Sequence, residues 1–174
     1  MERRFTLIVT HVPGYFERRE AVSELRSILG VVEVVSRYNN VLLLWHPRPL
    51  EAVNILRRSL PKSTPILRVI PVLDVRRPLV TEVREAVHKL LTRAPRGSFA
   101  IRIDGYLVDE DGRLMHRLDA VKFIAEGVER PVNLESPDVL VYIKVVGRPA
   151  HKAAAIYVGP REGILSIPRE RGHG

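Results

Sequence analysis

The first part of the chain alternates between apolar runs and turn residues in a pattern that predicts a strand followed by a helix. The β-rich run 5–10 ends before Pro13 and Gly14, which is typical of a strand that leads into a turn. Apolar residues at helical spacing over 21–29 predict a helix, because they fall on one face of it. Gly30 stands where the C-terminal cap of that helix belongs.

The following segments predict a hairpin, a second helix and a further strand. Two apolar runs, 31–35 and 41–45, flank the polar segment 37–40, which is typical of an antiparallel hairpin with a tight turn. An apolar stripe then predicts a helix over 50–60, and the run 66–73 predicts a strand. The order βαββαβ is that of a ferredoxin-like domain.

A second set of periodic segments follows the charged stretch 74–78, which we interpret as a domain boundary. Thr81 is expected to cap the next helix. The acidic run 109–112 is expected to form the turn at the tip of a long loop. The elements predicted here are a helix with its stripe over 83–91, a strand over 98–103, a helix over 118–128, and strands over 139–146 and 153–158.

The pattern as a whole predicts an α+β protein of two domains. We expect the N-terminal ferredoxin-like βαββαβ domain to span 1–75 and a second α/β domain to span 76–168, with a flexible tail over 169–174. No run approaches the roughly 20 consecutive apolar residues that a membrane-spanning helix needs. The N-terminus also lacks a signal-peptide profile, so we expect a soluble, cytoplasmic protein.

The composition has a strong basic bias and excludes several kinds of covalent, metal and catalytic site. The formal charge is +8, and 23 of the 28 basic residues are arginine, whose planar guanidinium favours bidentate contacts with phosphate. Nucleic acid is therefore the expected partner, although a preference for arginine also occurs in some thermophilic families. The absence of cysteine excludes disulfides, cysteine-ligated zinc, iron–sulfur clusters and thiol nucleophiles.

Two short motifs lie in the second half, each within a suitable element. The first, S-F-A-x-R, occupies 98–102 in a predicted strand, and the second, V-x-L-x-x-P-D, occupies 132–138 and leads into the last two strands. In this order they resemble the THUMP domain, a tRNA-binding module that a ferredoxin-like domain typically precedes. The resemblance covers roughly residues 1–168 and implies a THUMP-like α/β domain over 76–168. One departure is the acidic stretch 104–111, where comparable domains often carry basic residues.

The resemblance implies recognition of the acceptor stem and 3′ end of tRNA. Larger THUMP proteins carry a methyltransferase, sulfurtransferase or deaminase module, but this chain has no G-x-G-x-x-G, no P-loop and no H-x-E followed by P-C-x-x-C. It looks most like the stand-alone THUMP proteins, among them the adaptor that presents tRNA to an acetyltransferase making N4-acetylcytidine. We therefore expect a non-catalytic tRNA-binding protein without a cofactor, whose partner is a separate tRNA-modifying enzyme.

The candidate RNA site consists of basic residues on or beside the motif strands. The loop before the first strand and the turn between the last two are expected to flank one groove, because phosphate binding needs converging cations. The alternative is a solvated basic surface. The predicted residues are Arg93, Arg96, Arg102, Lys144, Arg148, His151 and Lys152.

Other functions remain open from the sequence. A small RNA-end hydrolase or phosphoesterase with His11 or His151 as its base is the main alternative, and a purely protein-binding scaffold is a third. The six histidines show no zinc-site spacing, so no metal site is expected. Among the aromatic residues, Tyr106 is expected to be exposed and able to stack on an unpaired base, whereas Trp45 and Tyr142 are expected in or near the core.

Overall fold

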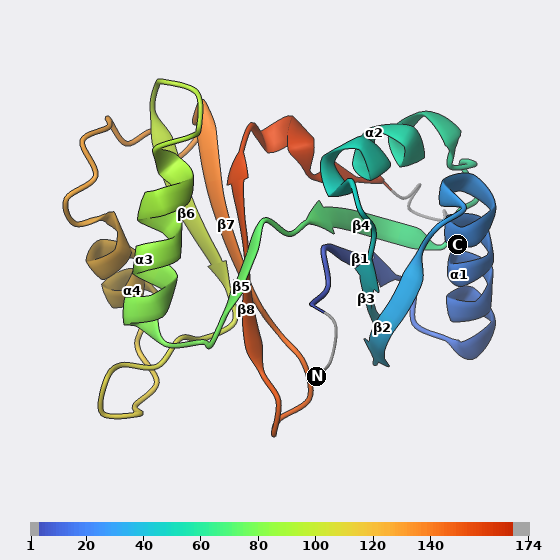
Figure 1. The fold of residues 1–174 in the computed structure, drawn as a ribbon, viewed down its shortest axis with the longest axis horizontal. Helices are drawn as coiled ribbons and strands as arrows, with labels where there is room; N and C mark the ends of the chain where they lie inside the picture. The colour runs from blue at the N-terminus through green and yellow to red at the C-terminus, as the bar shows by residue number, and fades with distance from the viewer. Residues whose placement is uncertain (1–3, 169–174) are drawn as a thin grey trace, which may run out of the picture. The chain divides into compact units, whose positions relative to one another are not determined.

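The computed structural model describes residues 4–168, which fold as two compact α+β units (Figure 1). Unit 1 contains residues 4–72 and 162–168, and unit 2 contains residues 73–161. The α+β class is the predicted one, but the division differs from the expected boundary after residue 75, because 162–168 return to the first unit. The expected tail, 169–174, lies outside the described residues. Over residues 4–168, no helix has both the length and the apolar character to cross a membrane.

Unit 1 is an antiparallel sheet covered on one face by two helices. Its strand order is β2-β3-β1-β4-β9, so β1 and β2 run in the same direction with β3 between them. This split βαβ arrangement confirms the predicted ferredoxin-like topology. The elements are β1 (Leu7–His11), α1 (Tyr15–Leu29), β2 (Glu33–Tyr38), β3 (Val41–Trp45), α2 (Pro49–Ser59), β4 (Ile66–Pro71) and β9 (Leu165–Ser166).

The core of unit 1 explains why the C-terminal segment returns to it. Leu25 of α1 and Leu56 of α2 are buried against inward-facing strand residues such as Val9. Leu165 joins the same cluster from β9, where its partner in the β4 ladder is Val69. Burying this leucine stabilises the added edge strand by removing its apolar surface from water. A two-residue strand has no detectable period, so the sequence did not indicate it.

Unit 2 is a four-stranded mixed sheet with two helices on one face. The strand order is β5-β8-β7-β6, in which β6 and β7 are parallel and the other neighbouring pairs are antiparallel. The elements are β5 (Asp74–Arg76), α3 (Val80–Leu91), β6 (Phe99–Asp104), α4 (Arg117–Ala125), β7 (Val139–Val146) and β8 (Ala153–Gly159), and the 3-10 turn η1 (Arg161–Gly163) follows β8.

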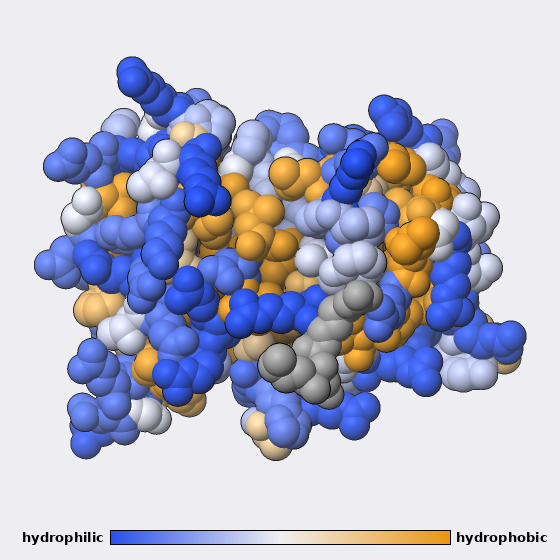
Figure 2. Space-filling model, viewed as in Figure 1, coloured by the Kyte–Doolittle hydropathy of each residue, from blue (hydrophilic) through white to orange (hydrophobic). Residues whose placement is uncertain are grey.

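The helices of unit 2 cover the sheet with apolar stripes at the predicted positions. Val83 and Val87 of α3 and Ile124 of α4 are fully buried against Val141 and Ile143 of β7. The opposite side of α3 carries hydrophilic side chains, which cover this helix in the view of Figure 2. Burial on one side and hydration on the other is the expected behaviour of an amphipathic helix.

At the start of unit 2, one expectation was wrong and one strand had not been predicted. The stretch 74–78, interpreted as a domain boundary, lies close to the division between Val72 and Leu73, and its residues Asp74–Arg76 form the edge strand β5, in which Asp74 and Arg76 form an ion pair at 3.0 Å. Thr81 does not cap α3, because the helix already begins at Val80 and makes no side-chain cap. The Val80 amide instead donates to the Val108 carbonyl at 2.9 Å, so the excursion after β6 supports this helix end.

Candidate nucleic-acid interface

The seven predicted basic residues fall into two groups on the unit 2 sheet. Two lie on the loop before β6, and five lie between the middle of β6 and the turn that follows β7. Because β6 and β7 run parallel in register, the loop before β6 and the turn after β7 lie at opposite ends of the strands. A strand of this length spans about 17 Å at ~3.3 Å per residue. The single groove expected between that loop and that turn is therefore not formed. We call Arg93 and Arg96 the N-edge group, and Arg102, Lys144, Arg148, His151 and Lys152 the C-edge group.

The N-edge group lies on the loop between α3 and β6. Arg93 and Arg96 are both exposed, and within residues 4–168 neither side chain has a hydrogen bond or an ion pair. The loop itself is fixed by Arg130. Its guanidinium donates to the carbonyls of the surrounding turn, namely Leu91 at 3.0 Å, Ala94 at 3.4 Å, Pro95 at 2.6 Å and Gly97 at 3.3 Å. Two unpaired cations on a held loop are suited to contact phosphates.

The V-x-L-x-x-P-D motif holds the start of β6 beside this loop. The Phe99 amide donates to the Pro131 carbonyl at 2.9 Å, and the Asn133 amide donates to the Phe99 carbonyl at 3.1 Å. The Asn133 Oδ1 atom accepts from the amides of Glu135 and Ser136, which shapes the turn that follows. The motif thus has a positioning role in this structure, next to the N-edge group.

The C-edge group is partly neutralised by an acid of the sheet. The Lys144 Nζ atom lies 2.6 Å from Asp104 Oδ2, and the Tyr142 hydroxyl donates to the same oxygen at 3.3 Å. The Lys144 side chain is only 16% exposed, whereas Arg102 is an exposed residue of β6 without a partner among the described residues. Of the two strand cations, Arg102 is therefore the one available to a ligand.

The turn between β7 and β8 supplies the rest of the C-edge group. Arg148, His151 and Lys152 are all exposed, and the His151 amide donates to the Arg148 carbonyl at 2.8 Å, which closes the turn. The Lys152 side chain has no partner within residues 4–168. The acidic stretch 104–111, where the sequence departs from the THUMP domains that it resembles, neutralises a lysine of the C-edge group. Its first residue, Asp104, forms an ion pair with Lys144.

The structure adds an arginine that sequence reasoning did not find. Tyr106 is 51% exposed, as expected, and the Arg117 guanidinium lies 4.7 Å from its ring centroid. The Arg117 Nε atom also donates to the Gly105 carbonyl at 3.3 Å. Sequence spacing does not predict this contact, because the long loop between β6 and α4 brings the two residues together. Tyr142 is 6% exposed and belongs to the core, as expected.

The histidines give little support to a hydrolytic site. His11 is 0% exposed, and its Nδ1 atom lies 2.7 Å from the Val12 carbonyl oxygen. A fully buried imidazole cannot contact a substrate, which counts against His11 as a general base. His151 is exposed but has no carboxylate partner within residues 4–168. The same residues contain no group of three or more metal-ligating side chains.

Comparison with known proteins supports the fold. No protein-family model and no curated protein sequence matches the chain. Among solved structures, PH1313 from Pyrococcus horikoshii Ot3 matches with a TM-score of 0.66 and 14% identity, over 93% of this chain and 55% of that one. A 4-thiouridine synthetase in complex with RNA and ATP matches with a TM-score of 0.54 and 15% identity, over 92% of this chain and 45% of that one.

A third solved structure has a similar fold. TrmN from Thermus thermophilus gives a TM-score of 0.51 and 15% identity, over 88% of this chain and 45% of that one. The chain thus spans about half the length of these solved proteins. At such identities the likeness shows the fold alone. That fold, extending over almost the whole chain, is consistent with the THUMP-like arrangement that the two motifs resemble.

Proposed function

We propose that this protein binds RNA in the course of tRNA modification, by recognising the acceptor stem and 3′ end of tRNA. The observation that carries the proposal is the N-edge group, in which Arg93 and Arg96 are exposed and unpaired on a loop that Arg130 holds. The similarity of fold to a synthetase whose structure was solved with RNA supports the choice of ligand.

Binding would depend on shape and charge more than on base sequence. Phosphates give most of the affinity for RNA through the release of counterions, and an A-form stem presents its phosphates and 2′-hydroxyls in a fixed pattern. Because the loop of the N-edge group and the turn of the C-edge group lie at opposite ends of the strands, they would contact phosphates that are well separated along the RNA. Single-stranded 3′-terminal nucleotides would lie near one group and the stem near the other.

We further propose that the chain acts as a non-catalytic adaptor. The sequence lacks the cofactor cradles and the deaminase motif of the larger THUMP proteins. A separate enzyme, such as an acetyltransferase forming N4-acetylcytidine, would then carry out the chemistry on the tRNA that this protein holds. The resemblance to stand-alone THUMP proteins is the support for this finer assignment.

A fluorescence anisotropy titration with a labelled tRNA transcript tests the proposed function. Wild-type protein should bind, with an affinity that falls as salt rises, and the double variant Arg93→Glu/Arg96→Glu should bind at least about 10-fold more weakly. Lys122→Glu, a single reversal at an exposed lysine of α4 outside both groups, is the control for a change of charge as such and should weaken binding much less than half as strongly in free energy. Absence of binding at low salt would contradict the proposal. Turnover of end-labelled tRNA by the purified protein alone would support a hydrolase instead.

A further inference from the structure

Two exposed aromatic residues, Tyr15 and Phe16, begin α1 directly after the turn that follows β1 (Figure 1). Tyr15 is 66% exposed, and Phe16 is 76% exposed, the highest value among the large apolar side chains of residues 4–168. The inner side of the helix is formed instead by Ala21 and Leu25, which are buried in the core of unit 1. Folding thus leaves two aromatic rings in water, where their burial against a ligand would be favourable.

The two rings and a neighbouring arginine form one surface, which we call the α1 platform: Tyr15, Phe16 and Arg19. The ring centroids of Tyr15 and Phe16 lie 5.7 Å apart, and the ring planes meet at 73°, so the edge of one ring points toward the other. The guanidinium carbon of Arg19 lies over the Tyr15 ring, 5.8 Å from its centroid, within the range of a cation–π contact. These contacts use part of the Tyr15 surface. The more exposed Phe16 ring is left as a face on which a planar group can stack.

The helix start that carries the α1 platform is held in place by polar contacts. The Arg18 amide donates to the Gly14 carbonyl at 3.1 Å, and Arg18 Nη2 donates at 3.0 Å to the Asn39 carbonyl in the turn between β2 and β3. Gly14 has a φ of +139°, and a Cβ on it would collide with the Glu17 carboxylate. Glycine therefore leaves room for this acid at the positive end of the helix dipole. A further anion is disfavoured there, so the rings are the surface offered to a ligand.

A second unpaired cation lies along the same side of α1. Arg26 follows Tyr15 by 11 residues, about three helical turns, so Tyr15, Arg19 and Arg26 share one side of the helix. Arg26 is exposed, and its side chain has no partner within residues 4–168. Glu20 is exposed on the other side, one turn after Phe16. The phosphates of a polyanion are thus favoured on the Tyr15 side, and its apolar groups over Phe16.

We propose that Tyr15 and Phe16 stack on unpaired bases of single-stranded RNA, while Arg19 and Arg26 contact its phosphates. Stacking removes the exposed rings from water, and every base has the flat face that this contact needs, so we expect little preference among bases. Paired bases within a stem do not expose their faces, which restricts the site to single-stranded segments. This inference rests on the proposed RNA-binding function and deepens it by giving unit 1 an RNA contact of its own.

Anisotropy titration with a short, labelled single-stranded RNA tests the α1 platform. Tyr15→Ala/Phe16→Ala should bind this RNA about 10-fold more weakly than wild type, because base–aromatic stacking is lost. Val31→Ala/Leu50→Ala, which removes exposed apolar side chains elsewhere in unit 1, is the matched control and should bind as wild type does. A blunt duplex of the same sequence should bind wild type and both variants alike. Equal affinity of wild type and Tyr15→Ala/Phe16→Ala for the single strand would overturn the proposal.

Two further variants separate stacking from general apolar contact. Tyr15→Phe/Phe16→Tyr keeps both rings and should retain wild-type affinity for the single strand. Tyr15→Leu/Phe16→Leu keeps apolar side chains without a ring and should lose about as much affinity as the alanine pair. In NMR spectra of wild type, a stacked base should shift the Phe16 ring protons upfield when the RNA is added. Wild-type affinity in the leucine pair, or unmoved Phe16 ring protons, would overturn the stacking contact.

The dependence of affinity on salt separates the arginines from the rings. Arg19→Gln/Arg26→Gln should reduce the slope of log affinity against log salt concentration by about 1.4, because two cations no longer contact the phosphates of a single strand. Tyr15→Ala/Phe16→Ala should leave this slope unchanged, because it removes no charge. A wild-type slope in the arginine variant would show that Arg19 and Arg26 do not contact the RNA.

The two proposals fail in different ways. If tRNA binding depends on Arg93 and Arg96 but Tyr15→Ala/Phe16→Ala changes the affinity for neither tRNA nor the single strand, the α1 platform is wrong and the proposed function stands. If the single strand binds through Tyr15 and Phe16 but tRNA does not bind even at low salt, the proposed function is wrong and the α1 platform serves another RNA.

Discussion

The Asp138 carboxylate accepts two hydrogen bonds from Ser98, a residue 40 positions earlier in the chain: one from its amide at 2.9 Å and one from its hydroxyl at 3.1 Å. The Asp138 amide in turn donates to Ser98 Oγ at 3.1 Å. Gly97 has a φ of +129°, and a Cβ on it would lie 2.3 Å from the same carboxylate. The last residue of one motif thus fixes the first residue of the other, which sets the parallel register of β6 and β7.

Asp138→Asn should destabilise the protein by about 1–2 kcal/mol, because the amide group accepts less strongly and repels the Ser98 amide in one of its orientations. Urea denaturation measures the loss. Because Ser98 is the partner, a double-mutant cycle with Ser98→Ala should show a coupling energy of about 0.5–1 kcal/mol. Asp111→Asn, at an exposed turn residue, is the control and should change stability little. Strict additivity of the Ser98 and Asp138 changes would show that the interaction contributes nothing.

Arg130→Lys should loosen the loop that carries the N-edge group. Lysine keeps the charge but has no planar fork, so it cannot donate to four carbonyls of one turn at once. We expect a loss of about 1–3 kcal/mol in the free energy of unfolding and faster amide exchange over 93–98. Hydrogen exchange followed by mass spectrometry measures the second effect. Protection of the loop at the wild-type level would contradict the role assigned to Arg130.

The parts of the fold that the sequence predicted correctly are those whose patterns involve neighbouring residues. The hairpin of β2 and β3 and the stripe of α3 are periodic over neighbouring residues, so the sequence indicated them correctly. The parallel pairing of β6 with β7 depends on contacts between residues 40 apart, such as Asp104 and Lys144, and periodicity does not reveal strand direction. For this reason the sequence suggested suitable cations but placed them around one groove.

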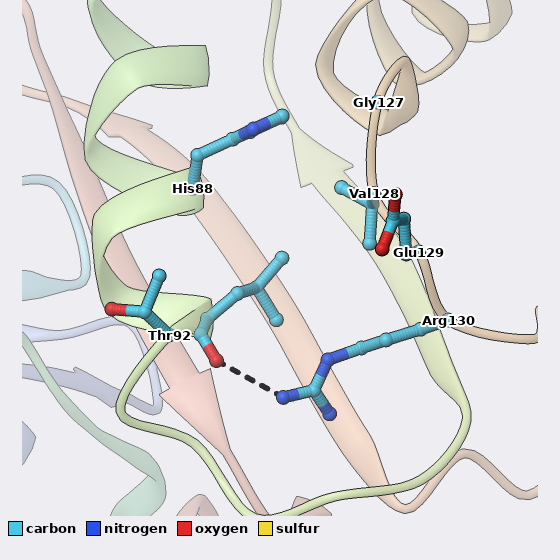
Figure 3. A pocket seen from close by; sticks show the side chains of 7 residues that line it. His88, Thr92, Gly127, Val128, Glu129 and Arg130 are labelled. Atoms are coloured by element: carbon cyan, nitrogen blue, oxygen red, sulfur yellow. Dashed lines mark hydrogen bonds between the residues drawn. The ribbon is translucent and has the colours of Figure 1, made fainter.

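A pocket between the end of α3 and the segment after α4 could not be predicted from the sequence for a related reason (Figure 3). Two of its lining residues, His88 and Arg130, lie 42 positions apart, one on a helix and one in a loop. Only the packing of α3 against α4 brings them to the same cavity, through the contact of His88 with the Ile124 carbonyl. A histidine on the inner side of a predicted helix is a weak signal until its partner is known.

Asp104→Asn should strengthen RNA binding. The substitution removes a negative charge from the C-edge group and releases Lys144, whose Nζ atom now lies 2.6 Å from the carboxylate. We expect tRNA affinity to rise about 3-fold to 10-fold at low salt, with a steeper dependence on salt because one more cation is available for phosphate. Anisotropy titrations at several salt concentrations measure both quantities. Asp111→Asn makes the same change of charge without releasing a lysine, so an equal gain in that variant would contradict the mechanism.

The two cation groups should act independently. Arg93→Glu/Arg96→Glu alters the N-edge group on the loop before β6, and Arg102→Glu/Lys152→Glu alters the C-edge group in β6 and in the turn after β7. Because the two groups share no partner, the losses in binding free energy should add in the fourfold variant to within about 0.5 kcal/mol. The measurement is tRNA affinity at fixed salt for all three variants. A fourfold variant no weaker than either double variant would show that only one group contacts the RNA.

Glu24 gives unit 1 a dependence of stability on pH. Burial raises the pKa of this carboxyl, the Thr64 hydroxyl that donates to it lowers the pKa to a lesser extent, and Glu20 raises it further. A raised pKa in the folded state means that the protein is stabilised by the neutral acid. This contribution is complete below the pKa of the unfolded chain and is lost as pH rises through the folded value.

Glu24→Gln keeps an oxygen that can accept from Thr64 and removes the titrating group. The variant should therefore gain stability over wild type as pH increases from about 4 to about 7, and the difference should level off once wild-type Glu24 is ionised. Thermal unfolding monitored by circular dichroism over this range measures the difference. Glu110→Gln, in the exposed turn after β6, is the control and should change the stability by the same amount at both ends of the pH range. A difference between Glu24→Gln and wild type that stays constant with pH would show that the carboxyl titrates alike in the folded and unfolded chains.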